Sequence, residues 1–169
     1  MDGQKLAERI CRESRRSQAL VQEDSKAFMA AVQKIRFERR YYLRRNAADA
    51  RSRLRLLSRS FSDHVAREEK EIFPRVRRMT PALLPLQNLL SLEHREFADR
   101  AAALDRGLAA LEKKTPADPA APARKIYSDG IYLVCLVRSH FAVEGDGFYR
   151  MLRERLSSES RPALLSEAS

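Results

Sequence analysis

The chain contains three histidines, and each lies on the apolar stripe of a predicted helix. His64 and His140 open the same four-residue-spaced unit, His-x-x-x-Glu, which ends at Glu68 and Glu144. Four residues is just over one helical turn, so each unit points an imidazole and a carboxylate toward one side of its helix. His94 is the third histidine. Burying such groups on apolar stripes is costly unless they find partners, so together they predict a metal site.

Composition and periodicity predict an all-α fold. The 169 residues include only five glycines, and Ala, Leu, Arg and Glu, all good helix formers, are abundant. Apolar residues at three- and four-residue steps predict a first helix from about 4 to 43, and stripes for three further helices over 54–72, 83–111 and 133–151. We expect an antiparallel, up-down-up-down four-helix bundle over residues 1–156, followed by a flexible tail at 157–169.

Three breaks separate the predicted helices. The polar run 44–49 ends the first helix, Thr80-Pro81 caps the start of the third after Pro74 has bent or ended the second, and the Pro-rich linker 113–122 precedes the fourth. Residues equally far from a short turn lie at the same height in an antiparallel pair of helices. The breaks therefore set the relative heights of the side chains on neighbouring helices.

The three histidines fall at one height by this construction. His64 and His94 are symmetric about residue 79, and His94 and His140 are symmetric about residue 117. Running the same construction from His64 through a turn centred near residue 45 leads to Ser25 on the first helix. Serine is a poor metal ligand, so the first helix is expected to supply no strong donor at the site.

These motifs resemble the hemerythrin-like, or HHE, cation-binding domains over residues from about 15 to 152. The run from His64 to Pro74 is similar to the second-helix signature of the family, Leu92-Glu-His94 to the third and His140-x-x-x-Glu144 to the fourth. The resemblance implies that His64, His94 and His140 are terminal ligands of non-haem iron, and that Glu68 and Glu144 bridge two iron ions. It also assigns Ser25 to the position of a first-helix histidine and Gly145 to that of a second glutamate.

The resemblance implies a protein that binds or senses O₂, NO or peroxide, or handles iron in oxidative or nitrosative stress, rather than a dedicated enzyme. The N-terminus lacks the apolar core of a signal peptide, so we expect a cytoplasmic protein. A di-iron site, a mononuclear site and a bundle that has kept the fold without metal remain alternatives. An oxidase or peroxidase would also need a proton donor. Tyr41, Tyr42 and Tyr149 are available, but the sequence places none of them at the metal.

The charge distribution suggests a different function, a binding module with a degenerate metal site. The net charge is +10, and residues 1–60 hold 16 Lys and Arg against 7 acids. The Arg36–Arg59 region could therefore dock an anionic partner such as nucleic acid, a membrane or an acidic protein. No apolar run is long enough to cross a bilayer. Cys11 and Cys135 lack a CxxC partner, and Cys135 lies in an apolar run, where a buried free thiol is expected.

Overall fold

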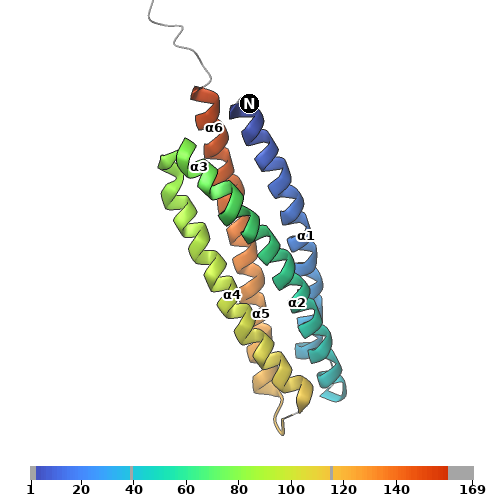
Figure 1. Ribbon diagram of the computed structural model, residues 1–169. Helices are drawn as coiled ribbons and strands as arrows, with labels where there is room; N and C mark the ends of the chain where they lie inside the picture. The colour runs from blue at the N-terminus through green and yellow to red at the C-terminus, as the bar shows by residue number, and fades with distance from the viewer. Residues whose placement is uncertain (1–2, 39, 115, 160–169) are drawn as a thin grey trace, which may run out of the picture.

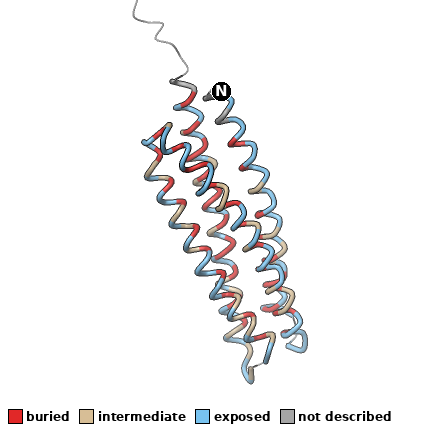
Figure 2. The backbone as a smooth tube through the Cα atoms, viewed as in Figure 1, coloured by how far each residue is buried: buried red, intermediate tan, exposed pale blue. Residues whose placement is uncertain are grey.

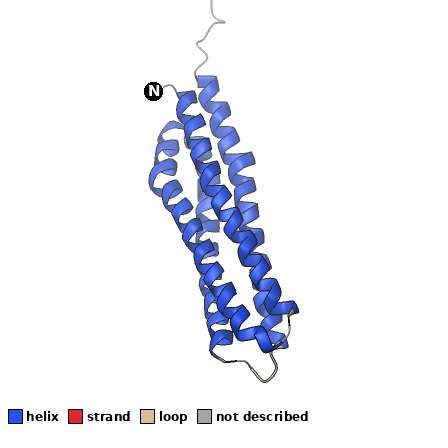
Figure 3. Cartoon of the chain, turned by 90° about the vertical axis from the view of Figure 1, so that its right-hand side faces the viewer, coloured by secondary structure: helices blue, strands red, loops and turns tan. Residues whose placement is uncertain are grey.

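Four long helices lie side by side in the computed structural model, which describes residues 3–38, 40–114 and 116–159 (Figure 1). They are α1 (Gly3–Phe37), α2 (Leu43–Arg67), α4 (Leu84–Lys113) and α5 (Ala120–Ala142). The helices run alternately up and down, and the described part of the chain contains no strand (Figure 3). The predicted all-α, antiparallel four-helix bundle is therefore confirmed.

Short helical segments join or extend the long helices. The connection from α1 to α2 is η1 (Arg40–Tyr42), and α2 continues through the π-helical segment η2 (Glu68–Ile72) into α3 (Phe73–Met79). The turn η3 (Pro81–Leu83) leads into α4. Helix α5 continues through a second π-helical segment, η4 (Val143–Tyr149), into α6 (Arg150–Glu159). The predicted tail begins within α6, and its residues 160–169 lie outside the described residues, so the boundary at 156 stays a prediction.

The chain stays helical through Pro74 because the helix widens before it. Proline has no N–H, and its ring clashes with the carbonyl four residues earlier in a regular α-helix. The segment η2 ends two residues before Pro74, and its i→i+5 hydrogen-bond pattern relaxes the spacing there. The helix then ends at Met79, and Pro81 opens η3 as predicted, but the predicted cap by Thr80 is wrong, because its buried hydroxyl makes no hydrogen bond to any described residue.

The predicted end of the first helix is wrong by several residues. The polar run 44–49 lies inside α2, and α1 ends at Phe37. Asn46 is buried, and its side-chain amide donates to the Glu38 carboxylate at 2.8 Å just beyond the end of α1. A polar residue that bridges two helices cannot be distinguished by pattern from one that breaks a helix. The turn is therefore centred near residue 40 instead of 45.

The buried residues form two apolar clusters with a polar layer between them. Figure 2 shows buried positions recurring along all the long helices. On each helix, buried or half-buried polar side chains separate one cluster from the other: Ser14 and Ser17 on α1, His64 and Glu68 on α2 and η2, His94 on α4, and His140 and Glu144 on α5 and η4. The bundle thus encloses a layer of ionisable groups with apolar packing above and below it.

Several arginines of the predicted docking region Arg36–Arg59 bind within the bundle. Arg40 donates to two backbone carbonyls of the linker between α4 and α5, and Arg44 donates to a carbonyl near the end of α4. Arg51 forms an ion pair with Asp105 of α4, with 2.9 Å between Nε and Oδ1. These contacts hold the ends of the helices together, so part of the positive charge of this region is already paired.

The structure contradicts the prediction about Cys135 and agrees with the prediction about membrane spans. Cys135 is exposed on α5, so the expectation of a buried thiol there is wrong, whereas Cys11 is buried. An apolar run of helix need not face the core along its whole circumference, which explains the error. Among the described residues, no helix combines the length and the apolar character that crossing a bilayer requires.

Substitution of two adjacent leucines of α2 tests which face of the helix packs in the core. Leu57 is fully buried, whereas Leu56 is 47% exposed. We expect Leu57→Ala to lower the free energy of unfolding by about 2–5 kcal/mol, because it removes packed methyl groups and leaves a cavity. Leu56→Ala is the matched control and should change stability by less than about 1 kcal/mol. Chemical denaturation of both variants checks this, and equal losses would contradict the assigned helix orientation.

Candidate metal centre

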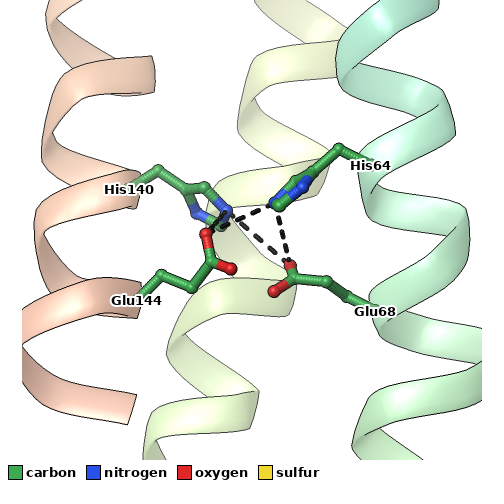
Figure 4. A group of neighbouring side chains, drawn as sticks. All are labelled: His64, Glu68, His140 and Glu144. Carbon is green, nitrogen blue, oxygen red and sulfur yellow. Dashed lines mark ion pairs between the residues drawn. The ribbon is translucent and has the colours of Figure 1, made fainter. Parts of the chain in front are cut away.

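Two His-x-x-x-Glu units meet in the polar layer. His64 and Glu68 come from α2 and η2, and His140 and Glu144 come from α5 and η4 (Figure 4). One donor atom from each of these four residues lies within 4.8 Å of all the others, and all four residues are buried. The four residues, called the central cluster below, form a candidate metal site of two imidazoles and two carboxylates.

His94 of α4 joins the central cluster from the side through Glu68. The Oε2 atom of Glu68 lies 3.1 Å from His94 Nε2, 3.5 Å from His64 Nε2 and 3.8 Å from His140 Nε2. The His94 and His140 rings are 4.9 Å apart between centroids. The three imidazoles are therefore at one height, as the sequence predicts, and all three turn Nε2 toward the same carboxylate oxygen.

The outer nitrogen of two imidazoles is held by a carboxylate. His94 Nδ1 lies 2.9 Å from Oε1 of Glu69, and His140 Nδ1 lies 2.9 Å from Oε2 of Glu93. An ionised carboxylate only accepts hydrogen bonds, so in both rings Nδ1 carries the proton. In the neutral ring Nε2 then presents a lone pair to the centre. This is the arrangement of histidine ligands in metalloproteins, where the outer partner fixes the tautomer and the ring orientation.

Ser17 of α1 holds the outer nitrogen of the His64 ring, Nδ1. Its Oγ lies 2.8 Å from His64 Nδ1, and the same hydroxyl donates its single proton to the Ser14 carbonyl at 3.0 Å. The oxygen must therefore accept the hydrogen bond from Nδ1–H of His64. All three rings thus turn Nε2 inward. The Nε2 atoms of His64 and His140 have no hydrogen-bond partner among the described residues, whereas that of His94 shares a hydrogen bond with Glu68 Oε2, whose raised pKa lets it hold the proton.

The carboxyl groups of Glu68 and Glu144 also accept hydrogen bonds from hydroxyl and amide groups around the cluster. Glu144 accepts from Ser14 Oγ at 2.6 Å and from Gln18 Nε2 at 2.8 Å, and Glu68 Oε1 accepts from the Tyr149 hydroxyl at 3.2 Å. Burial raises the pKa of Tyr149, and the charges of Glu68 and Glu144 add to this, so the phenol keeps its proton and donates. These contacts orient both carboxylates without neutralising them.

Two buried carboxylates at one place cannot both ionise freely. Burial, reinforced by the charge of Glu144, raises the pKa of Glu68 well above its usual range. Burial also raises the pKa of Glu144, but the hydrogen bonds and charge of its neighbours, His64 first, outweigh this and lower it to about 2. The opposite shifts are those of a pair that shares one proton.

A cation satisfies every group that the protein leaves unsatisfied here. Three imidazole Nε2 atoms and the oxygens of two carboxyl groups converge on one buried space, where Glu68 and Glu144 share one proton and Nε2 of His64 and of His140 have no hydrogen-bond partner in the described part of the chain. Like-signed partial charges at these separations repel in a poorly screened interior. Imidazole and carboxylate together suit zinc, iron and other first-row metal ions. The donor set therefore fits a metal ion better than it fits an apolar core.

Aromatic rings enclose the cluster. Phe61 lies 6.1 Å from the His64 ring, 6.0 Å from that of His94 and 5.4 Å from that of His140. Phe73 is parallel to the His94 ring at 6.1 Å, and Phe141 lies 5.2 Å from His64. These rings exclude water, which strengthens any electrostatic interaction between the cluster and a bound ion.

Both glutamates of the cluster lie in π-helical segments. Glu68 is the first residue of η2 and Glu144 the second residue of η4. Such segments are rare and occur often at functional sites. Gly145 and Gly147 within η4 lower helix propensity, and a Cβ at Gly145 would meet no atom within 4 Å. The backbone has room for a side chain at Gly145, so lack of space does not require glycine there.

The first-helix prediction is wrong about which serine faces the site. Ser25 is buried, but its hydroxyl donates to the Val21 carbonyl in its own helix at 2.8 Å, and Ser25 is not part of the cluster. Because the turn lies near residue 40, the residue level with His64 is Ser17. The site also uses Glu69, Glu93 and Tyr149 as partners, which the sequence analysis did not assign to the site.

No protein-family model, curated protein or solved structure matches this chain significantly. The chain is nevertheless characterised by its own geometry as an all-α four-helix bundle with a buried His/Glu cluster that is a candidate metal site.

The stability of the metal-free protein tests the electrostatic description of the cluster. Glu68 has a raised pKa in the folded state, so its contribution to stability is full below about pH 4.3 and is lost as pH rises toward the folded pKa. Glu68→Gln removes this loss, and its amide can donate to His94 Nε2. We expect the metal-free variant to be more stable than the metal-free wild type at pH 8.

The pH dependence and a neighbouring variant complete this test. The advantage of Glu68→Gln should shrink as pH falls toward about 4, where Glu68 is protonated in both states. Glu71→Gln changes an exposed glutamate of the same π-helical segment and should leave stability almost unchanged. A destabilised Glu68→Gln protein, or an advantage that does not vary with pH, would contradict the account of the cluster. Thermal denaturation over pH 4–8 measures all three proteins.

Proposed function

We propose that this chain is a hemerythrin-like, non-haem iron protein that binds or senses a small ligand such as O₂, NO or peroxide. The observation that carries the proposal is the inward orientation of three imidazoles, each fixed through Nδ1 by Glu69, Glu93 or Ser17. A histidine that only fills a core position satisfies both ring nitrogens with protein groups. Here the outer nitrogen has a partner, and Nε2 of His64 and of His140 has none.

The donor atoms support one ion with four protein ligands and a second ion beside it. The central cluster offers two nitrogens and two carboxylates from His64, Glu68, His140 and Glu144, which leaves coordination positions of an iron ion free. His94 lies outside this set but within 3.1 Å of Glu68 Oε2, so a second ion would share Glu68 and take His94. No imidazole of α1 is available to complete the second position, because the three histidines of the chain lie on α2, α4 and α5.

Iron bound by these residues would supply a Lewis-acidic, redox-active ion with a free coordination position. The chain's own residues would orient it and control the protons around it. Tyr149 holds a proton 3.2 Å from Glu68 Oε1, at the edge of the cluster. Glu69 is partly exposed and contacts Nδ1 of His94, so it connects the solvent with the imidazole.

A groove between α2 and α4 gives small uncharged molecules a route to the site. Its volume is about 520 Å³, and His94 and Phe61 line its inner part. Most of the remaining lining is small or apolar: Leu54, Ser58, Ser62, Val65, Ala66, Phe97, Ala98, Ala101 and Ala102. Such a lining favours an uncharged diatomic molecule or peroxide over a polar metabolite. This supports gas or peroxide binding more than an exchange of large substrates.

Tyr149 beside Glu68 favours a second candidate function for the same iron site, that of a peroxidase or oxidase. Such an enzyme needs a proton donor near the metal, and Tyr149 is the described residue that meets this requirement. Turnover of peroxide that falls in Tyr149→Phe, with iron content unchanged, would favour the enzyme over the sensor. Binding of NO or O₂ that is unaffected by Tyr149→Phe, without turnover, would favour the sensor.

Metal content is the direct test of the proposal. We expect tag-free protein expressed with added iron to hold at least one iron per chain by elemental mass spectrometry. His140→Ala removes a ligand of the central cluster and should weaken iron binding by more than about tenfold. Ser25→Ala is the matched control, because Ser25 is buried on α1 but does not contact the cluster. Iron absent from the wild type, or retained equally by His140→Ala, would contradict the proposal.

The iron content of the His94→Ala variant tests how many ions the site binds. The central cluster keeps all four of its ligands in this variant, so we expect one iron per chain to remain. If the wild type holds two, the missing ion is the one that His94 binds. Complete loss of iron in His94→Ala would contradict the assignment of the central cluster as a self-sufficient site.

A further inference from the structure

A second pocket lies on the outer side of His94. Whereas the groove between α2 and α4 is mostly apolar, the lining of this pocket is mostly charged or polar. Its volume is about 690 Å³, and its walls come from η2, α3 and the facing part of α4. Phe73, Glu69 and three arginines, Arg77, Arg78 and Arg95, line it. Phe73 and Arg77 are four residues apart on α3, as are Pro74 and Arg78, so these side chains project from one face of the helix.

The arginines of this pocket are not neutralised by the protein. In the part of the chain that the structure describes, Arg77 and Arg78 have no carboxylate partner, and the contact recorded for Arg95 is to the Ser91 carbonyl of its own helix at 3.3 Å. The acidic group among the lining residues is Glu69, whose Oε1 is engaged by Nδ1 of His94 at 2.9 Å. Three guanidinium groups therefore share one concavity with one carboxylate, so the lining carries a net positive charge.

This pocket differs from the Arg36–Arg59 region, where several arginines are bound within the bundle. Like charges that converge on a concave surface repel each other and focus a positive potential there. The guanidinium fork matches the oxygens of phosphate in a two-point geometry. A volume of about 690 Å³ lies within the range of small-molecule sites and exceeds what a bare oxyanion needs. A single concavity also suits a small molecule better than a polymer, which would need an extended basic strip.

We propose that the pocket between α3 and α4 binds a small phosphate-bearing molecule through Arg77, Arg78 and Arg95. Phe73 closes the inner end of the pocket and is parallel to the His94 ring, so an apolar part of the ligand would rest against it. Glu69 is at once a wall of the pocket and the partner of His94, which brings the bound molecule next to the outer contacts of the candidate metal centre. The anion site does not depend on a bound metal.

Calorimetric titration of the full-length, metal-free protein tests the site at constant ionic strength. The probes are inorganic phosphate and phenyl phosphate, and the metal-free protein is used because phosphate could otherwise bind iron. We expect saturable one-site binding of at least one probe. Arg77→Ala and Arg95→Ala should each weaken it by about tenfold or more, as loss of a charge-assisted hydrogen bond does. Arg106→Ala changes an exposed arginine of α4 outside the pocket and should alter the affinity by less than about twofold.

The two probes distinguish the sources of the phosphate group. Equal affinities indicate a site for free phosphate, and tighter binding of phenyl phosphate indicates an organic phosphate whose apolar part reaches Phe73. Circular dichroism establishes that each variant is folded, and amide shifts of Phe73 and Arg77 in NMR spectra locate the binding. Absence of saturable binding for both probes, or equal weakening by Arg106→Ala, would overturn the proposal. Neither result would bear on iron binding in the central cluster.

Discussion

The convergence of imidazole lone pairs and carboxylates inside an apolar bundle is the constraint on which the rest of the structure depends. His64 and His140 turn unpartnered Nε2 atoms toward Glu68 and Glu144, and Phe61 helps to exclude water from the space between them. Such a layer costs stability without a cation or a shared proton. It separates the core into two apolar clusters, so the packing on both sides must hold these charged groups at one height.

The secondary structure around the site is adapted to this layer. Each glutamate of the central cluster lies in a π-helical segment that continues a long helix, and one such segment precedes Pro74 while the other contains Gly145 and Gly147. The outer partners of the imidazoles come from other elements than the imidazoles themselves, since Ser17 of α1 holds His64 and Glu93 of α4 holds His140. The site therefore fixes the packing of all four helices against one another, in addition to any ion that it binds.

The sequence predicted the fold class and the meeting of the three histidines, because helical spacing and turn symmetry determine height along a bundle. It placed Ser25 at the site instead of Ser17, since a buried polar residue that bridges helices, Asn46, looks like a break in periodicity. The outer partners could not be predicted, because they depend on contacts between helices and not on spacing within one. Tyr149 follows this rule: its contact with Glu68 joins residues 81 positions apart.

Anomalous diffraction at the iron absorption edge, from crystals of the iron-loaded protein, tests the central claim most directly. The account predicts a peak within coordination distance of both His64 Nε2 and His140 Nε2, with the Nδ1 contacts to Ser17 and Glu93 unchanged. A second, weaker or equal peak beside His94 would be consistent with it. Iron found only at surface carboxylates, with both Nε2 atoms still without a ligand, would contradict the account.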